Sequence, residues 1–253
     1  MQMSRTTELA VDLMWQANKF AVLTGAGVSK ESGIPTFRDA QTGLWAQYDP
    51  QQLASPSGFL KDPSLVWQWY DMRRSKLAQV EPNPAHYAIA ELEHLVPSLV
   101  VLTQNVDGLH RLAGSKNVVE LHGNISTFHC FDGLHEQGSV QLGLTDPPRC
   151  HCGSLVRPSV VWFGEALPEI ALQQAFAAAR DCDLMFAIGT SGLVQPAASL
   201  PFIAKQHGGK IIEVNPDVTP ITEIADIVIK LPAGAAMPEL VKAYAGHSTA
   251  RCH

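Results

Sequence analysis

The 253-residue sequence has no long apolar run and no dense run of basic side chains. No apolar stretch approaches the ~18 residues needed to span a bilayer, and the start, MQMSRTTELA, lacks the apolar core of a signal peptide. The net charge of −6 is mild, and lysine and arginine do not cluster as they do on nucleic-acid or membrane surfaces. We therefore expect a cytoplasmic protein that binds neither nucleic acids nor membranes. We also expect a monomer.

Cysteine is also scarce, because only five occur in the whole chain and three of them lie at positions 130, 150 and 152. An odd number with this crowding favours metal binding or free thiols in a reducing compartment over a disulfide framework. Hydrophobic residues make up 46% of the chain, which is enough to bury one large core, with or without a smaller lobe. Disorder is therefore not expected.

Short apolar strands alternate with segments of helical periodicity, which predicts an α/β fold with a Rossmann-like parallel sheet and helices on both faces. The expected strands are residues 20–23, 99–102, 184–188, 210–214 and 226–231. The expected helices lie near residues 6–18, 84–95, 168–180, 196–206 and 237–245. Two segments depart from this pattern, about 40–83 and about 125–157, and we interpret them as insertions that form a small lobe within one domain spanning 1–253.

Small or hydrogen-bonding residues follow four of these strands. They are Gly25-Ala26-Gly27, Thr103-Gln104-Asn105, Gly189-Thr190-Ser191 and Asn215. In an open parallel sheet, ligands bind beyond the carboxyl ends of the strands, so we expect these clusters to converge on one site. Each cluster taken alone also fits ordinary turn chemistry.

The loop after the first strand begins like a dinucleotide-binding fingerprint, but Lys30 stands where the third glycine of G-x-G-x-x-G belongs. This weighs against an NAD-linked dehydrogenase, although glycine amides can still approach a pyrophosphate. Phe37 and Arg38 follow closely, and an aromatic face and a cation would suit an enzyme that cleaves the dinucleotide. On composition alone, Phe37 fits a core position equally well.

Six motifs, in this order between residues 25 and 217, resemble those of the sirtuins, which are NAD-dependent protein-lysine deacylases. The motifs are GAGVSKESGIPTFRD (25–39), TQNVDGLH (103–110), LHGN (121–124), RPSVVWFGE (157–165), GTSGLVQPA (189–197) and EVNPD (213–217). The resemblance implies that NAD and an acyl-lysine peptide meet between a large domain and a zinc-binding lobe. An NAD-sensing module without turnover is a further alternative.

The resemblance also assigns roles by position. It makes His122 the catalytic base, whereas an isolated histidine after a short strand more often has a structural role. The positions implied for NAD are Gly25, Ala26, Gly27, Phe37, Arg38, Gln104, Asn105, Val106, Asp107, Gly189, Thr190, Ser191, Asn215, Pro216, Asp217 and Ala233. Asp107 would otherwise be interpreted as a solvated loop carboxylate.

Two further sets concern the peptide and its acyl group. Extended stretches with Val161, Phe163, Gly192 and Val194 could pair with a substrate strand, although residues 160–163 would equally suit a core. A helix over 63–79 places Trp67, Tyr70 and Arg73 on neighbouring turns of one face, which by periodicity alone predicts an inward aromatic face with Arg73 reaching water. Tyr-x-x-Arg nevertheless resembles the pair in sirtuins that remove succinyl and malonyl groups.

The metal motif departs from the family pattern. Most sirtuins hold zinc with two cysteine pairs, but here Gly133 replaces the partner of Cys130, while Cys150 and Cys152 form the second pair. Structural zinc takes four nitrogen or sulfur ligands, so one of His129, His135 and His151 would have to complete the set.

Overall fold

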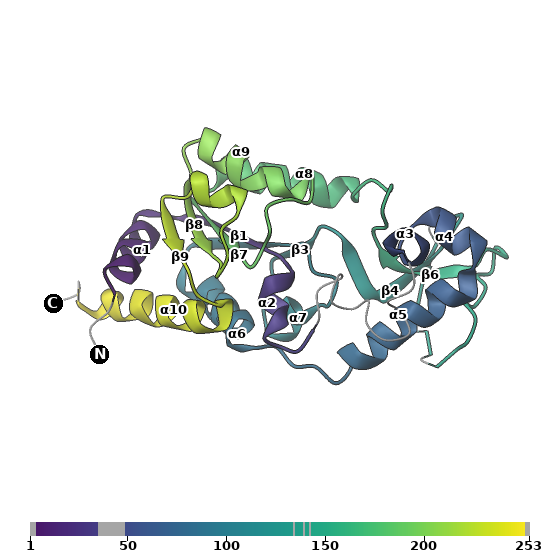
Figure 1. Ribbon diagram of the computed structural model, residues 1–253. Helices are drawn as coiled ribbons and strands as arrows, with labels where there is room; N and C mark the ends of the chain where they lie inside the picture. Colours follow the sequence, from purple (N-terminus) through teal and green to yellow (C-terminus); the bar gives the residue numbers. More distant parts are fainter. Residues whose placement is uncertain (1–3, 35–48, 134, 139, 142, 251–253) are drawn as a thin grey trace.

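The structure is a computed structural model that describes residues 4–34, 49–133, 135–138, 140–141 and 143–250, with side chains described up to residue 246. Two sheets form its framework, and Figure 1 shows them at opposite ends of an elongated molecule. Phe37 and Arg38 lie outside the described residues. None of the helices in these ranges combines the length and apolar character needed to cross a membrane.

The larger sheet is parallel throughout and has the strand order β3-β2-β1-β7-β8-β9. Its strands are β1 (Lys19–Thr24), β2 (Ser98–Thr103), β3 (Val118–Glu120), β7 (Leu184–Ile188), β8 (Lys210–Val214) and β9 (Ile227–Ile229). The chain moves outward from β1 to β3 and then returns to place β7 beside β1. The order therefore reverses between β1 and β7, and the ligand crevice of such a sheet lies at this point. The predicted fold class is confirmed.

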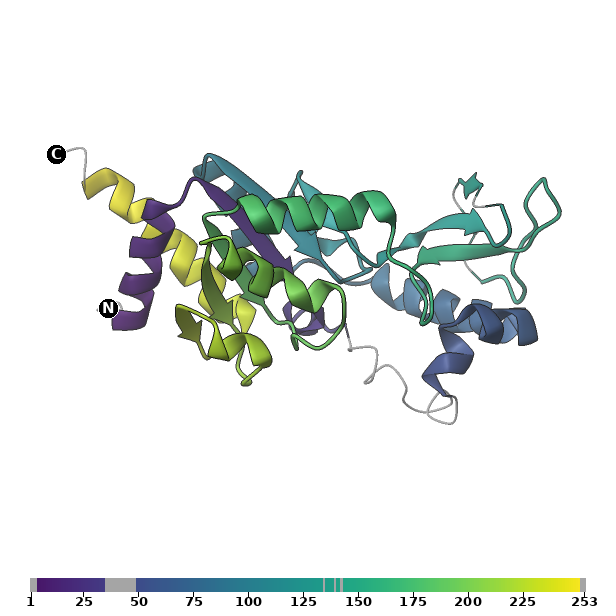
Figure 2. The ribbon, with the colours of Figure 1, turned by 90° about the horizontal axis from the view of Figure 1, so that it is seen from above.

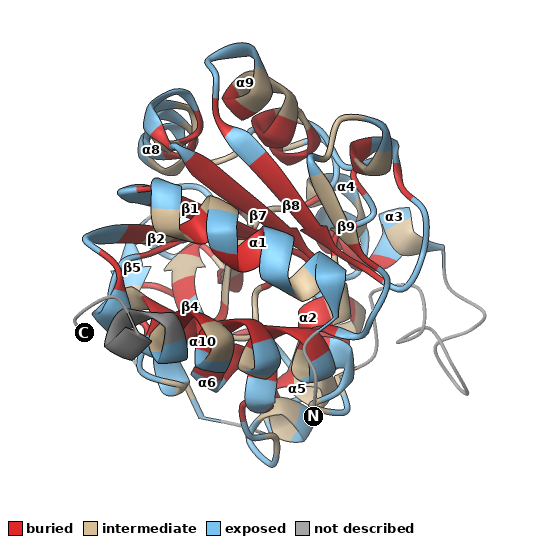
Figure 3. Cartoon of the chain, turned by 90° about the vertical axis from the view of Figure 1, so that its left-hand side faces the viewer, coloured by how far each residue is buried: buried red, intermediate tan, exposed pale blue. Residues whose placement is uncertain are grey.

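Successive residues of the central strands face opposite layers of helices, which is why these strands are continuous apolar runs. Phe20 and Val22 pack with α1 (Arg5–Gln16), α6 (Pro84–Leu95) and α10 (Ala233–Ala250). Ala21 and Leu23 pack with α8 (Glu169–Asp181) and α9 (Leu200–Gln206), which follows a short 3₁₀ turn, η2 (Ala197–Ser199). Figure 3 shows the buried strands between these two layers.

Three short elements cap the carboxyl edge of this sheet. They are α2 (Ala26–Lys30), α7 (Leu109–Leu112) and the 3₁₀ turn η3 (Pro220–Glu223). The last helix, α10, begins four residues before the predicted start at residue 237 and contains Pro238. Proline suits the first turn of a helix, which is why the sequence predicts the later start.

The smaller sheet is antiparallel, with the order β5 (Glu136–Gln137), β4 (Gly123–Cys130) and β6 (Val156–Val160). It packs with α3 (Pro50–Leu53), α4 (Pro56–Lys61) and α5 (Pro63–Leu77). Each of these helices begins with a capping side chain followed by proline, a pairing that fixes helix starts. Figures 1 and 2 both show this assembly at the end of the molecule farthest from the chain termini.

Candidate functional site

Three glycines bring the loops after β1 and β7 into backbone contact. The amide of Gly27 donates a 2.8 Å hydrogen bond to the carbonyl of Gly189. A Cβ atom at Gly25 or Gly27 would lie 2.8 or 2.7 Å from that same carbonyl oxygen, and Gly189 has a φ of +58°. Larger residues would separate the loops, so these glycines maintain a closely packed junction at the point where the strand order reverses.

Thr190 joins the clusters that follow two other strands, β2 and β8. Its hydroxyl accepts a 2.9 Å hydrogen bond from the Gln104 amide, and its carbonyl accepts a 2.8 Å bond from the Asn215 amide. Asn105 in turn donates to the carbonyl of Gly25 at 3.1 Å. The structure thus brings the four predicted strand-end clusters together at one edge of the sheet.

The remaining residues predicted for NAD lie around this edge. Ala26, Ser191, Pro216 and Asp217 are exposed, Val106 is partly buried, and Ala233 is buried at the start of α10. Next to Ala233, the amide of Gly234 donates a 2.6 Å hydrogen bond to the Glu31 carboxylate.

A directed chain of hydrogen bonds connects Asn105 to Asp107. The Asn105 amide donates to the Ser29 hydroxyl at 2.9 Å, and that hydroxyl donates to the Asp107 carboxylate at 2.7 Å. The other oxygen of Asp107 accepts the amide of Leu109 at 3.0 Å. Asp107 is therefore held from both sides and is not the freely solvated carboxylate of the alternative interpretation. Ser29 lies within the quoted glycine motif, one helical turn after Gly25, yet sequence reasoning did not select it.

His122 lies in the turn between β3 and β4, and its ring is oriented by one hydrogen bond. Nδ1 lies 3.0 Å from the carbonyl oxygen of Gln104, which can only accept, so Nδ1 carries the proton and Nε2 keeps its lone pair. Burial lowers the pKa of His122, and this outweighs the backbone hydrogen bond that raises it. The side chain is therefore a neutral imidazole at pH 7 with Nε2 free to accept a proton.

Two buried histidines behind Asp107 were not found from the sequence. The rings of His86 and His110 lie 4.9 Å apart, and His110 Nε2 contacts the Thr24 hydroxyl at 3.0 Å. Burial lowers the pKa of His86 to about 4 and that of His110 to about 3. They come from α6 and α7, 24 positions apart, and no local pattern signals their pairing.

The α5 helix distributes its aromatic residues between two clusters, so the predicted single stripe is only partly correct. Trp67 packs with Phe128 and Cys130, whereas Tyr70 packs with the group that contains Trp162. The Arg73 guanidinium lies over the Tyr70 ring at 5.9 Å from its centroid. Burial lowers the pKa of Arg73, whereas Tyr70 and Asp107 raise it to a smaller extent. The expectation that the Arg73 side chain reaches into water is therefore not met.

Residues 160–163 alternate between the interior and the surface. Val160 and Trp162 are buried, Val161 is partly buried and Phe163 is 48% exposed. In the second stretch predicted for the substrate, Gly192 is buried and Val194 is half exposed. Val160 and Trp162 are therefore core residues, whereas Val161 and Phe163 are not.

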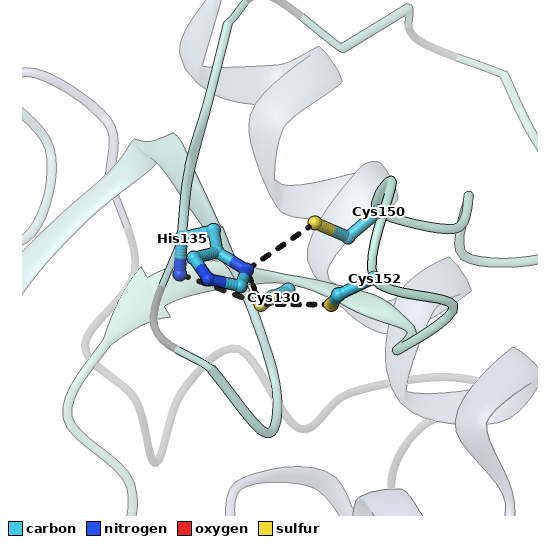
Figure 4. Close-up of side chains that lie close together, drawn as sticks. All are labelled: Cys130, His135, Cys150 and Cys152. Carbon is cyan, nitrogen blue, oxygen red and sulfur yellow. Dashed lines mark hydrogen bonds between the residues drawn. The ribbon is translucent and has the colours of Figure 1, made fainter.

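Four side chains converge at the end of the smaller sheet, and Figure 4 shows them pointing toward one another. Cys130, His135, Cys150 and Cys152 place their ligand atoms within 4.8 Å of one another. Cys130 Sγ lies 3.3 Å from His135 Nδ1 and 3.7 Å from Cys152 Sγ, while Cys150 Sγ lies 3.7 Å from His135 Nδ1. Tetrahedral zinc requires about 3.8 Å between two sulfurs and about 3.5 Å between sulfur and nitrogen, so this set fits the metal.

His135 is therefore the histidine that joins the three cysteines in this cluster, a choice that the sequence left open between three histidines. His129 instead contacts the Ser159 hydroxyl at 2.9 Å, and His151 lies beside the cluster, 3.4 Å from Cys150 Sγ. A Cβ atom at Gly133 would lie 2.7 Å from Cε1 of His135. The imidazole thus occupies the space that a side chain at position 133 would need.

Comparisons with known proteins agree with this geometry. The model of the Sir2 family matches residues 25–196. An NAD-dependent protein deacylase 1 of Pseudomonas aeruginosa is 49% identical over 241 residues, covering 92% of this chain and 96% of that protein. An NAD-dependent protein deacylase of Thermococcus kodakarensis is 50% identical over 241 residues, covering 92% and 93%.

Two solved structures extend the likeness to the fold. A Sir2 homologue in complex with NAD has a TM-score of 0.89 and 46% identity, covering 97% of this chain and 95% of that one. Sir2 in complex with an inhibitor, 2′-O-acetyl-ADP-ribose and a deacetylated p53 peptide has a TM-score of 0.80 and 33% identity, covering 93% and 98%. With its ordered motifs, its parallel sheet and its Cys3His cluster, this chain belongs to the Sir2 family.

Proposed function

We propose that the chain is an NAD-dependent protein-lysine deacylase with His122 as its general base. The observation that carries the proposal is the hydrogen bond from His122 Nδ1 to the Gln104 carbonyl, which leaves Nε2 as an acceptor. A general base must be unprotonated at working pH, and burial lowers the pKa of this imidazole. The deacylase names of relatives about 50% identical support the same activity.

NAD would bind across the carboxyl edge of the parallel sheet. The glycine junction of Gly25, Gly27 and Gly189 would admit the pyrophosphate, with Ala26, Thr190 and Ser191 beside it. Asn215, Pro216, Asp217 and Ala233 would meet the adenosine end. Gln104, Asn105, Val106 and Asp107 would meet the nicotinamide ribose, and Ser29 would hold Asp107 in position. By the family resemblance, Phe37 and Arg38 would add an aromatic and a cationic side chain to the NAD site.

The chemistry explains why the substrate lysine is acylated. Loss of nicotinamide leaves positive charge at the ribose carbon, which the weakly nucleophilic amide oxygen of an acyl-lysine can attack. His122 Nε2 would then accept the proton of a ribose hydroxyl so that this oxygen can attack the acyl carbon. The lysine would then leave as its amine, and a water molecule would open the remaining cyclic intermediate by supplying one hydroxyl group. With this water counted, the products would be nicotinamide, O-acyl-ADP-ribose and free lysine.

Acylated-lysine peptides would bind as an extended strand along two stretches of the chain. The exposed side chains of Phe163 and Val194, with Val161 and Gly192 beside them, form a partly apolar surface. The main chain of these stretches would pair with the main chain of the peptide. Main-chain pairing of this kind would depend little on the amino-acid sequence of the peptide.

The acyl groups would include succinyl and malonyl as well as acetyl. Tyr70 and Arg73 are the residues that would bind the terminal carboxylate, because a guanidinium fork matches a carboxylate and a phenol adds a hydrogen bond. Their proximity, with Arg73 over the Tyr70 ring, supports this assignment.

Zinc would be held by Cys130, His135, Cys150 and Cys152, where it would stabilise the small lobe and take no part in the chemistry. We assign this lobe to the insertions at about 40–83 and 125–157 of a single domain, and we expect the enzyme to be a cytoplasmic monomer.

One experiment separates the deacylase from the two alternatives. NAD is incubated with the protein in the presence and absence of acyl-lysine peptides, and nicotinamide is quantified. A deacylase releases nicotinamide only when an acylated peptide is present. Reduction of NAD would support the dehydrogenase instead, and binding without any release would support the sensing module.

A further inference from the structure

The hydroxyl of Tyr70 receives a hydrogen bond whose direction is chemically fixed. Trp162 Nε1 lies 2.9 Å from the Tyr70 oxygen, and both residues are buried, with relative exposures of 2% and 1%. An indole nitrogen donates and cannot accept. The Tyr70 oxygen therefore accepts from Trp162, and its own hydrogen must point elsewhere.

No described residue accepts that hydrogen, because the indole contact is the one hydrogen bond of the Tyr70 hydroxyl within the described part of the chain. The Arg73 guanidinium, which lies over the Tyr70 ring, also donates and cannot accept a hydrogen bond. Burial raises the pKa of Tyr70, so the hydroxyl keeps its proton through the neutral range. The Tyr70 hydroxyl is thus a buried group that accepts from Trp162 and has no acceptor for its own hydrogen among the described residues, and a buried donor without an acceptor is costly.

The indole ring has little freedom to turn away from Tyr70. The Arg157 guanidinium stacks on it at 3.3 Å from the ring centroid and pairs with Glu165 at 2.5 and 3.0 Å. Glu165 also accepts the backbone amide of Trp162 at 2.8 Å, while Arg157 donates to the Val160 carbonyl at 2.7 Å. One ion pair therefore fixes both the backbone and the ring of Trp162.

We infer that Trp162 is a positioning residue for acyl selection, which fixes Tyr70 as a hydrogen-bond donor and so favours acyl groups that end in an acceptor. This inference rests on the proposed function and names a residue that acts through Tyr70. A terminal carboxylate would accept the Tyr70 hydrogen, whereas the methyl group of an acetyl chain has no acceptor and would leave it unsatisfied. Trp162 thereby contributes to substrate choice without touching the substrate.

The test removes the indole N–H and measures kcat/KM for succinyl-lysine and acetyl-lysine versions of one peptide. Two variants do this: Trp162→Phe, and replacement of Trp162 by benzothienylalanine, which keeps the ring shape but has sulfur in place of N–H. The second protects the test if Trp162→Phe fails to fold. We expect the succinyl-to-acetyl ratio to fall about two- to tenfold, the range for one neutral hydrogen bond. The loss should appear in KM for the succinyl peptide, since the far end of the acyl chain is held equally in the ground and transition states.

Repeating both changes in a Tyr70→Phe background distinguishes positioning from general damage. Without the Tyr70 hydroxyl, the Trp162 changes should leave the ratio unaltered. A parallel fall in both activities, or an equal fall of the ratio in the Tyr70→Phe background, would overturn the inference while leaving the deacylase proposal intact. A parent protein that cleaves acetyl-lysine but not succinyl-lysine overturns the inference together with the acidic-acyl proposal.

Discussion

The backbone amide of Val161 donates a 2.9 Å hydrogen bond to the carbonyl oxygen of His122. The residue carrying the proposed base is therefore tied through its main chain to the stretch that leads into Trp162. Because this bond does not involve the imidazole, changing the His122 side chain leaves the connection in place. The chemistry of His122 can thus be tested apart from the fold.

His122→Ala should abolish deacylation while thermal stability and NAD binding stay close to those of the parent. Loss of a general base typically lowers rate ~10²–10⁴-fold. Within the described residues the imidazole makes one hydrogen bond, to the Gln104 carbonyl, and the main-chain hydrogen bond between Val161 and His122 does not depend on it. Steady-state kinetics with an acetyl-lysine peptide measure the effect, and His207→Ala, at an exposed helix end, is the control. Near-normal turnover by His122→Ala would contradict the assignment.

The pH dependence of kcat/KM should show an acid limb with a midpoint below 6.5. His122 works in its neutral form, and burial lowers its pKa, so more than half of the imidazole is still neutral at pH 6.5. Activity is then lost only as the pH falls through the lowered value. A midpoint above 6.5, measured with a substrate that does not titrate in this range, would show that burial does not control this group.

Arg73→Met should depress removal of succinyl groups about 10- to 100-fold more than removal of acetyl groups. A charge-assisted hydrogen bond contributes ~1.5–3 kcal/mol, and an acetyl group has no carboxylate to lose. The ratio of the two kcat/KM values cancels general damage to the fold. Lys76→Met, on an exposed position of the same helix, is the matched control. Equal losses for both substrates would make Arg73 a structural residue.

His135→Ala should release zinc or bind it more weakly, and adding Gly133→Cys should restore the metal. In the parent, the imidazole fills the space beside Gly133, so removing the ring makes room for a cysteine side chain there. The double variant would then offer four thiolates. Metal analysis and competition with a chelator measure the zinc, with His129→Ala as the control because His129 contacts Ser159. Full zinc retention in His135→Ala would assign the fourth position elsewhere.

The strands of the parallel sheet could be predicted because their chemistry is local. Residues 20–23 are all buried, so they form a continuous apolar run that can be recognised without knowing its partner strands. The strand-end glycines are equally visible, since close backbone approach excludes other residues. These two features together predict that a ligand-binding site lies at the carboxyl edge of the sheet.

Contacts between distant residues could not be predicted in this way. Trp162 was correctly considered as a core residue, but its hydrogen bond reaches Tyr70, 92 positions away. The choice of His135 depends on how the turn after β4 folds back on Cys130, and all three candidate histidines have suitable chemistry. His86 and His110 pair across two helices, and each alone has the sequence context of an ordinary histidine.

That buried pair should make the protein sensitive to acid. In the unfolded chain both histidines titrate near 6.5, whereas in the folded protein their pKa values are about 4 for His86 and about 3 for His110. Between these limits the unfolded state binds more protons, so the free energy of unfolding decreases as the pH falls from 6.5 toward 4. Each such proton contributes about 1.36 kcal/mol per pH unit.

His110→Gln removes one titrating group and can still donate to the Thr24 hydroxyl. The free energy of unfolding, measured with urea between pH 7 and 5, should therefore change less steeply with pH than in the parent, by an amount that corresponds to about one proton. Other groups cancel in this difference, because the two proteins differ at one position. An unchanged slope in His110→Gln would mean that His110 is already protonated in the folded protein or exposed to solvent.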